Sequence, residues 1–189
     1  MTEYFAQKTN SKGKEVMLIF NKSLAVCPLT THLPLKKIFK KITKDKIFKN
    51  VNTIYNFYKC HFKKKVRIGI TGLNPHCETT DKFSEDEKIL MPAVKKLRNK
   101  GIDIQGPYAA DTIFLKNNLK KFDVIIGMYH DQVLTPIKTL YGFNAINITL
   151  GLPFLRVTPD HGTNNQMIGK NLSNPTSLIE AIYFAKKIS

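Results

Sequence analysis

Three polar side chains with catalytic or metal-binding chemistry stand together directly after an apolar run. The stretch GMYHDQVLTP, residues 127–136, places histidine, aspartate and glutamine immediately after the apolar segment FDVIIG. Burying each of them without a partner would cost roughly 1–3 kcal/mol. We therefore expect these side chains at the mouth of a strand and not inside it.

Three of the five histidines follow apolar, strand-like runs: His32 in LTTHLPL, His76 in GLNPHCE and His130 in MYHDQ. One sheet could bring them to the same edge, and three protein ligands with an open position are the usual arrangement of a catalytic zinc or related divalent ion. The histidines lie far apart in sequence, and no HxxxH pair places two of them on one helix turn. Spacing alone leaves open both a metal site and histidines that merely cap or hydrogen-bond strand ends.

The elements that must position these residues alternate between strand and helix patterns. A capping box of Ser84 and Glu87 precedes one helix, and Gly101 stands where its C-terminal cap belongs. Such alternation predicts one α/β region over residues 1–189 with a largely parallel sheet and flanking helices, in which ligands bind beyond the carboxyl ends of the strands. The expected elements are a hairpin of 15–20 and 23–30, helices at 45–61, 85–100, 110–118, 133–140 and 174–187, and strands at 66–73, 101–108, 122–129 and 145–152.

The composition is that of a globular chain. It has 189 residues, of which 42% are hydrophobic and 10% aromatic, enough to bury a core. The three cysteines are too few for a disulfide framework and form no CxxC, and no apolar signal core opens the sequence. No window approaches the roughly 18 apolar residues of a membrane span. We expect a reduced, cytoplasmic protein that does not enter a membrane.

Lysine dominates the charge, because 30 Lys and Arg against 14 Asp and Glu give a net charge of +16. A lysine-rich solvated surface is the simplest interpretation, and attraction of anionic small substrates or of nucleic acid is the alternative. The aromatic residues of segment 47–58 recur at helical spacing, which indicates a core stripe and not a base-stacking surface. Nucleic acid is therefore the less favoured partner.

Six separate motifs carry a resemblance to a known family. They are TTHLPL, GLNPHCE, GPYAADTIF, MYHDQVLTPIK, INITLGLPFLRV and PDHGT, in this order. Their combination and spacing resemble the 4-hydroxythreonine-4-phosphate dehydrogenase (PdxA) family. The resemblance implies a fold similar to that of the isocitrate and isopropylmalate dehydrogenases, truncated here at the N-terminus, and NAD binding without a GxGxxG fingerprint, which this sequence lacks.

The resemblance also implies roles for individual residues. Three family metal ligands, for zinc, magnesium or cobalt, match His32, His76 and His130. In the family one ligand comes from the other subunit of a homodimer, so His130 would complete its partner's site. Asp131 is the candidate catalytic residue, and it could orient an imidazole, relay a proton or only cap a helix. The family's substrate contacts match Thr2, Lys138, Asn147 and Arg156.

The activity implied by the resemblance is NAD-dependent oxidation, with decarboxylation, of 4-phosphooxy-L-threonine to 3-amino-2-oxopropyl phosphate in pyridoxal phosphate (vitamin B6) biosynthesis. The sequence departs from the family in lacking its N-terminal segment, in having Met1 where a substrate-binding histidine stands, and in the details of NPHCE and DHGTNNQ. The alternatives are an inactive or half-enzyme remnant that needs a separate N-terminal lobe, and a basic nucleic-acid-binding protein.

Overall fold

A computed structural model describes residues 2–79, 82–163 and 165–188 as a seven-stranded sheet with the strand order β4-β3-β5-β2-β1-β6-β7. Strand β5 is parallel to β2 and β3, and β3 is parallel to β4, whereas β1 is antiparallel to both β2 and β6 and β7 is antiparallel to β6. Five of the seven strands, β2 to β6, consequently run in one direction. This confirms the predicted, mostly parallel sheet. The strands are β1 (Val16–Phe20), β2 (Ala25–Pro28), β3 (Ile68–Thr71), β4 (Ile104–Tyr108), β5 (Val124–Gly127), β6 (Ile146–Leu150) and β7 (Arg156–Pro159).

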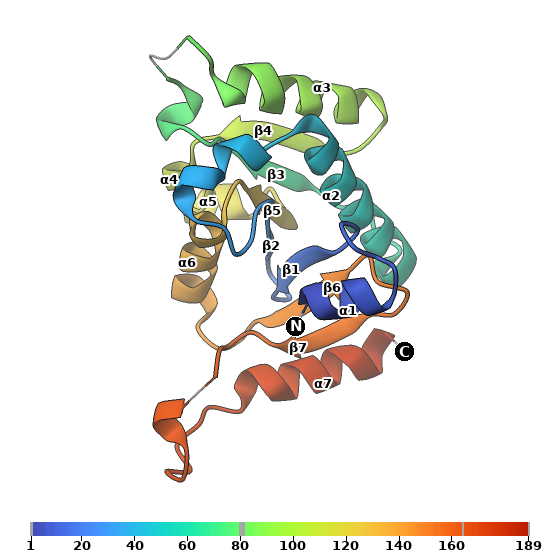
Figure 1. Cartoon of the computed structure of the whole chain (residues 1–189), viewed down its shortest axis with the longest axis vertical. Helices are drawn as coiled ribbons and strands as arrows, with labels where there is room; N and C mark the ends of the chain where they lie inside the picture. The colour runs from blue at the N-terminus through green and yellow to red at the C-terminus, as the bar shows by residue number, and fades with distance from the viewer. Residues whose placement is uncertain (1, 80–81, 164, 189) are drawn as a thin grey trace.

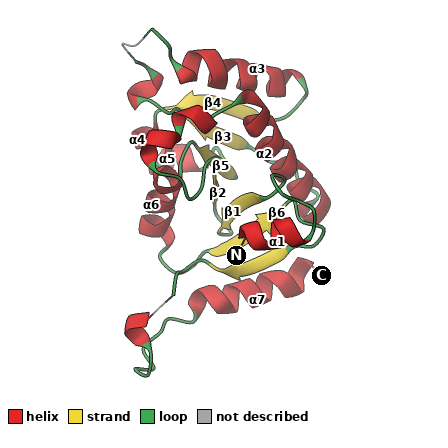
Figure 2. Ribbon diagram, viewed as in Figure 1, coloured by secondary structure: helices red, strands yellow, loops and turns green. Residues whose placement is uncertain are grey.

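Helices cover both faces of the sheet, as Figures 1 and 2 show. One face packs against α2, α3 and α7, and the other against α4 and α6. The short helix α1 packs near the start of β7, where the Phe5 ring contacts Phe154 with 6.0 Å between the ring centroids. The helices are α1 (Thr2–Lys8), α2 (Lys44–Phe57), α3 (Met91–Asn99), α4 (Ala110–Ile113), α5 (Lys116–Leu119), α6 (His130–Tyr141) and α7 (Thr176–Ile188).

The central strands are apolar on both faces because helices cover both. In β5 all four residues are buried, and successive side chains enter opposite clusters, with Val124 and Ile126 on the α2 side and Ile125 on the α6 side. This two-sided burial explains why VIIG reads as a continuous apolar run. Its polar neighbours can only lie beyond the strand ends.

Local signals set most element boundaries as predicted. The backbone N–H of Glu87 donates to Ser84 Oγ at 3.3 Å, and Gly101, with φ +81°, follows the end of α3. Asn174 Oδ1 accepts from the backbone N–H of Thr176 at 2.9 Å before α7 begins. In the part of the chain that the structure describes, no helix is both long enough and apolar enough to cross a membrane.

Two helices differ from the prediction, and two elements were not expected. The expected helix at 110–118 is two short helices, because the backbone of Leu115 is extended (ψ 142°). The helix expected at 85–100 begins with a π turn over Asp86–Leu90. Strand β7 and helix α1 were not expected, since each is short and has little periodicity of its own.

Candidate active site

The carboxyl ends of β2, β3 and β5 lie side by side at one edge of the sheet. Pro28 at the end of β2 pairs with Gly127 at the end of β5, and the pairing of β5 with β3 runs to Ile70. The loops that leave these ends carry the three predicted metal ligands. Thr30 Oγ1 donates to the Met128 carbonyl at 2.7 Å and holds two of these loops together.

Two of the three histidines meet at this edge. The ring centroids of His32 and His130 lie 5.9 Å apart, with the rings inclined at 40°. His130 opens α6, and its Nδ1 is 2.6 Å from Asp131 Oδ1. This contact leaves Nε2 of His130 available to a metal ion or a proton, as expected of an imidazole held by a neighbouring carboxylate.

The carboxylate of Asp131 contacts the His130 imidazole, and the structure gives α6 no side-chain capping bond. The N-cap position of α6 is occupied by Tyr129, which makes no side-chain capping bond. Asp131 lies in the first turn with its side chain 78% exposed, and its interaction with His130 is the contact that the structure gives it. Of the three roles that the sequence left open, the geometry favours orientation of His130.

His76 stands apart from this pair on a strained loop. It lies in the 3₁₀ turn Pro75–Cys77 with φ +55°, and Cys77 has φ +64°. Left-handed backbone costs a residue with a Cβ about 1–2 kcal/mol. Within residues 2–79, 82–163 and 165–188, no three His, Cys, Asp or Glu side chains lie close enough to hold one metal ion. The described chain therefore brings together two of the predicted ligands and not the third.

Asp86 holds the loop that leads to His76, a role that the sequence analysis did not recognise. It is fully buried, and its carboxylate accepts from the backbone N–H groups of Leu73 at 2.8 Å and Asn74 at 3.1 Å. The side-chain amide of Asn74 donates a third bond at 2.9 Å. The signal available in the sequence was an acidic residue just inside a helix start, which is usually assigned only to the helix dipole.

Gln132 ties the ends of two strands together. Its Oε1 accepts from Thr71 Oγ1 at 2.8 Å and from the backbone N–H of Met128 at 2.7 Å, and its Nε2 donates to the Gly72 carbonyl at 2.8 Å. The three polar residues of MYHDQ thus have separate roles. His130 lies beside His32, Asp131 contacts the His130 ring, and Gln132 joins the ends of β3 and β5.

Two of the predicted substrate contacts share the face of the sheet that α6 covers. Asn147 lies on β6, and its Oδ1 is buried without a hydrogen-bond partner. Arg156 opens β7 opposite Thr149, to which its Nη1 donates at 3.1 Å, and its guanidinium lies over the Phe5 ring at 5.8 Å. Because Asn147 and Thr149 are two residues apart on one strand, Asn147 and Arg156 face the same side.

Lys138 on α6 is engaged with Asp160, which follows β7. Its Nζ lies 2.8 Å from Asp160 Oδ2, an ion-pair distance without hydrogen-bond geometry, and donates to the backbone carbonyl of the same residue. Burial raises the pKa of the Asp160 carboxyl, and Lys138 opposes this shift. Lys138 is thus no ordinary surface lysine. Asp160 belongs to the PDHGT motif, but its contact with Lys138 was not predicted.

Thr2 and His32 line one cavity of about 540 Å³. Thr2 is the first residue of α1, and the cavity continues along the beginning of β1 to α2. The predicted substrate contact and one predicted metal ligand therefore face the same space.

Comparisons with known proteins place the chain among dehydrogenases. The family model described as "Pyridoxal phosphate biosynthetic protein PdxA" matches residues 1–185. A 4-hydroxythreonine-4-phosphate dehydrogenase of Sulfurihydrogenibium sp. (strain YO3AOP1) is 45% identical over 186 residues, which are 97% of this chain and 57% of that protein. A crystal structure of 4-hydroxythreonine-4-phosphate dehydrogenase from Klebsiella pneumoniae is similar to this chain, with a TM-score of 0.84 and 31% sequence identity. The match covers 100% of this chain and 57% of the Klebsiella chain.

A terephthalate 1,2-cis-dihydrodiol dehydrogenase from Burkholderia xenovorans LB400 shares the fold, with a TM-score of 0.77 at 23% identity. The chain spans somewhat more than half the length of the relatives that it matches.

Proposed function

The chain belongs to the PdxA family of pyridoxal phosphate biosynthetic proteins, and from this premise we propose that it takes part in the NAD-dependent oxidation and decarboxylation of 4-phosphooxy-L-threonine. The observation that carries the proposal is that His32, His76 and His130 follow the adjacent carboxyl ends of β2, β3 and β5. Thr2 lines the same cavity as His32, which supports a proposed substrate contact and a proposed metal ligand at one site.

The donor chemistry of the histidine pair fits a divalent ion. Imidazole suits zinc and related metals, and the Asp131 carboxylate at 2.6 Å holds His130 in the orientation that leaves Nε2 for a ligand. His32 and His76 of one chain would hold the ion together with a His130, because the described residues of one chain hold no group of three such ligands. A divalent ion held there would supply Lewis acidity toward a hydroxyl or carbonyl oxygen, and NAD would supply the hydride acceptor.

The chain's remaining site residues suit a substrate with two anionic groups. Arg156 presents a planar fork of donors that matches a phosphate or carboxylate. The ammonium group of Lys138 has three donors, of which Asp160 engages only part. The buried, unpartnered Oδ1 of Asn147 suits an ammonium or hydroxyl donor of the substrate. Thr2 would contribute a hydroxyl from the cavity wall.

The test is NADH formation by the purified chain with 4-phosphooxy-L-threonine, in the presence of zinc, magnesium or cobalt. We expect metal-dependent turnover that falls at least about 100-fold in His130→Ala, because a ligand of the ion is lost. His61→Ala is the matched control, since His61 is an exposed histidine that packs on Phe57. Turnover by His130→Ala at the level of the His61→Ala control would contradict the proposal.

We further propose a homodimer with shared sites, in which His130 of one chain serves its partner. In a mixture of His76→Ala and His130→Ala chains, a shared site restores one intact centre in each mixed dimer, which is about one quarter of the wild-type activity at equal mixing. If all three histidines act within one chain, the mixture stays inactive. Because His32 and His130 also lie close together within one chain, this mixing experiment decides between a site shared by two chains and a site within one chain.

A half-enzyme that needs a separate lobe is the second candidate, and α7 favours it. The inner face of α7 is buried through Ala181 and Phe184, whereas Ile182 and Tyr183 are 60% and 64% exposed, and Leu178 and Ile179 are exposed beside them. An apolar stripe of this kind is typical of an interface. We expect turnover to appear only after the unmatched part of a relative is added and Ile182→Ser to weaken that rescue. Turnover by the chain alone would contradict it.

A further inference from the structure

A hollow of about 670 Å³ opens at the carboxyl edge of the sheet, beside the loops that carry the three histidines. All three loops contribute to its wall, with Leu35 and Phe39 after β2, Asn74 and Phe83 after β3, and Tyr129 after β5. Figure 1 shows the short turns of residues 35–41 next to the loop that follows β3. Tyr129 directly precedes His130, so the hollow adjoins the proposed metal site.

The rim of this hollow is apolar and open to solvent. Leu35, Phe39 and Phe83 are 70%, 46% and 54% exposed. Large apolar side chains that gather around one hollow are typical of a surface that a protein partner covers. None of the four proposed substrate contacts lines the described wall of the hollow. Occupation by a protein partner is therefore compatible with the proposed binding of substrate elsewhere.

Opposite charges flank the hollow. Segment 35–42 has four lysines and no acidic residue, whereas segment 78–87 has one lysine and five of the chain's 14 acidic residues. Such an acidic segment is exceptional in a chain with a net charge of +16. Lys36, Lys40 and Glu87 are exposed, and Glu85 is half-buried in the wall of the hollow. A surface with one basic and one acidic side is complementary to a second copy of itself after a two-fold rotation.

The metal site gives a second reason to expect another copy at this place. Within the described residues of one chain, no three His, Cys, Asp or Glu side chains can hold one ion. In the proposed function, His130 of one chain serves the site of its partner. A partner that brings its His130 to His32 and His76 must cover the hollow, because the same loops form the wall of the hollow.

We propose that a second copy of this chain docks on the hollow in a two-fold dimer, in which Lys36 and Lys40 of each copy face Glu85 and Glu87 of the other. The apolar side chains around the hollow form the dry centre of the interface, and the charges at its rim set the register. The assignment rests on the proposed function, in which two chains share each site, and names the surface that joins them.

The first experiment measures the association of the full chain by sedimentation, without metal or substrate. We expect a dimer whose dissociation constant rises at least about 10-fold in Leu35→Asp, because the new carboxylate enters the dry centre. Leu115→Asp is the matched control, since Leu115 is 56% exposed and lies between α4 and α5, outside the wall of the hollow. A wild-type monomer at every concentration, or equal weakening in the two variants, would overturn the proposal.

The second experiment reverses the charges on one side of the hollow at a time. A chain with Lys36→Glu and Lys40→Glu is acidic on both sides, and a chain with Glu85→Lys and Glu87→Lys is basic on both. Each should dissociate at least about 100-fold more readily than the wild type, because like charges then face each other. In an equal mixture every facing pair is again opposite in sign, so mixed dimers should form.

The mixture separates a specific interface from general attraction. The two variants keep net charges of 16 − 4 = +12 and 16 + 4 = +20, so they repel each other over long distances. Mixed dimers would also show that both chains are folded. A chain with Lys12→Glu and Lys14→Glu, two exposed lysines outside the hollow, should dimerise as the wild type does. Undiminished dimers of each reversed chain, or a mixture of folded chains that stays monomeric, would contradict the assigned surface.

The docking surface and the proposed function fail separately, because association is measured without turnover. A wild-type dimer that forms NADH, with unaffected Leu35→Asp and charge-reversed chains, would overturn the surface and leave the function standing. Dimers that are lost in these variants of a chain that forms no NADH would support the surface against the function.

Discussion

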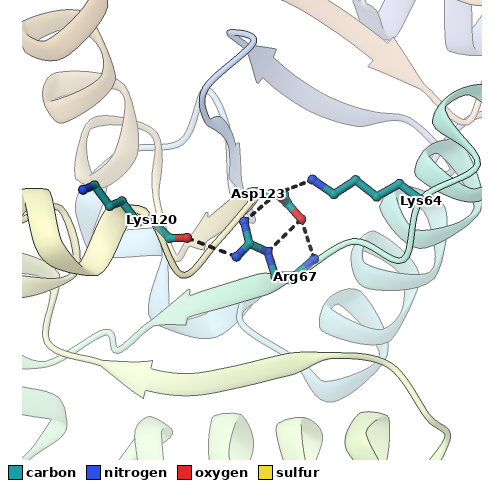
Figure 3. A network of polar contacts seen from close by, with 4 residues as sticks. All are labelled: Lys64, Arg67, Lys120 and Asp123. Carbon is teal, nitrogen blue, oxygen red and sulfur yellow. Dashed lines mark hydrogen bonds and ion pairs between the residues drawn. The ribbon is translucent and has the colours of Figure 1, made fainter.

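The polar groups at the two edges of the sheet differ in how completely they are hydrogen-bonded. At the amino edge, Asp123 before β5 accepts from Arg67 Nη2 at 2.9 Å, from Lys64 Nζ at 2.8 Å and from the backbone N–H of Arg67 at 3.0 Å (Figure 3). The guanidinium of Arg67 also donates to the Lys120 carbonyl at 3.0 Å. Burial alone would raise the pKa of Asp123, but the bonds from Arg67 and Lys64 lower it to about 2.

At the carboxyl edge, some polar groups are unpaired and one loop is strained. Glu15 Oε2 and Asn50 Oδ1, in residues that line the cavity, are buried without partners, and the left-handed backbone of His76 and Cys77 adds strain in the loop after β3. The amino edge of the sheet therefore stabilises the fold, whereas the carboxyl edge lowers its stability. Strained backbone and unpaired buried polar groups commonly occur together at sites where a protein binds a ligand or catalyses a reaction.

Removal of the support beneath the strained loop should have the largest effect. Asp86→Ala leaves three donors at Leu73 and Asn74 unmet in a fully buried position, which should cost about 3 kcal/mol or more of unfolding free energy. Urea unfolding measures this cost. Asp45→Ala, at an exposed aspartate near the start of α2, should change stability far less. Equal costs for the two variants would show that Asp86 does not hold the loop.

Breaking the ion-pair network of the amino edge should have the next largest effect. Asp123→Asn should cost about 1–2 kcal/mol at neutral pH, less than the full pKa shift because the cations are partly exposed. The folded pKa of Asp123 is depressed from 3.8 to about 2, so its contribution is complete above the unfolded value and is lost as the pH falls from about 4 toward about 2.

Urea unfolding of wild type and Asp123→Asn across that pH range should show the two stabilities converging on acidification. A difference that stays constant down to pH 2 would mean that the carboxylate is not what stabilises this edge. Activity at neutral pH should be unchanged in the folded variant, because the network lies at the edge opposite the site.

Relief of strain at the carboxyl edge should have the smallest effect on stability, and with the opposite sign. His76→Gly removes the Cβ from a residue with φ +55° and should raise the unfolding free energy by about 1 kcal/mol while it removes a predicted metal ligand. Metal titration and urea unfolding measure the two effects. A variant that is less stable and still binds metal as the wild type does would contradict both roles.

Much of the fold was predictable because its signals are local. The alternation of apolar strands with capped helices depends on neighbouring residues such as Ser84, Gly101 and Asn174, and the strand-end position of His130 followed from the cost of burying it. The roles of Asp86 and Gln132 were not predictable, because their partners lie on other elements. The cavity between α1 and α2 likewise depends on packing that no spacing pattern encodes.

The hairpin strand β1 lies between β2, its neighbour in sequence, and β6, far along the chain. Phe20 pairs with Ile146, a sequence separation of 146 − 20 = 126 residues. Contacts of such high order form late, since the long intervening loop must close before they contribute any energy. During synthesis the edge of β1 stays unpaired until residues 146–150 have emerged, and over that interval it is a site at which nascent chains can associate.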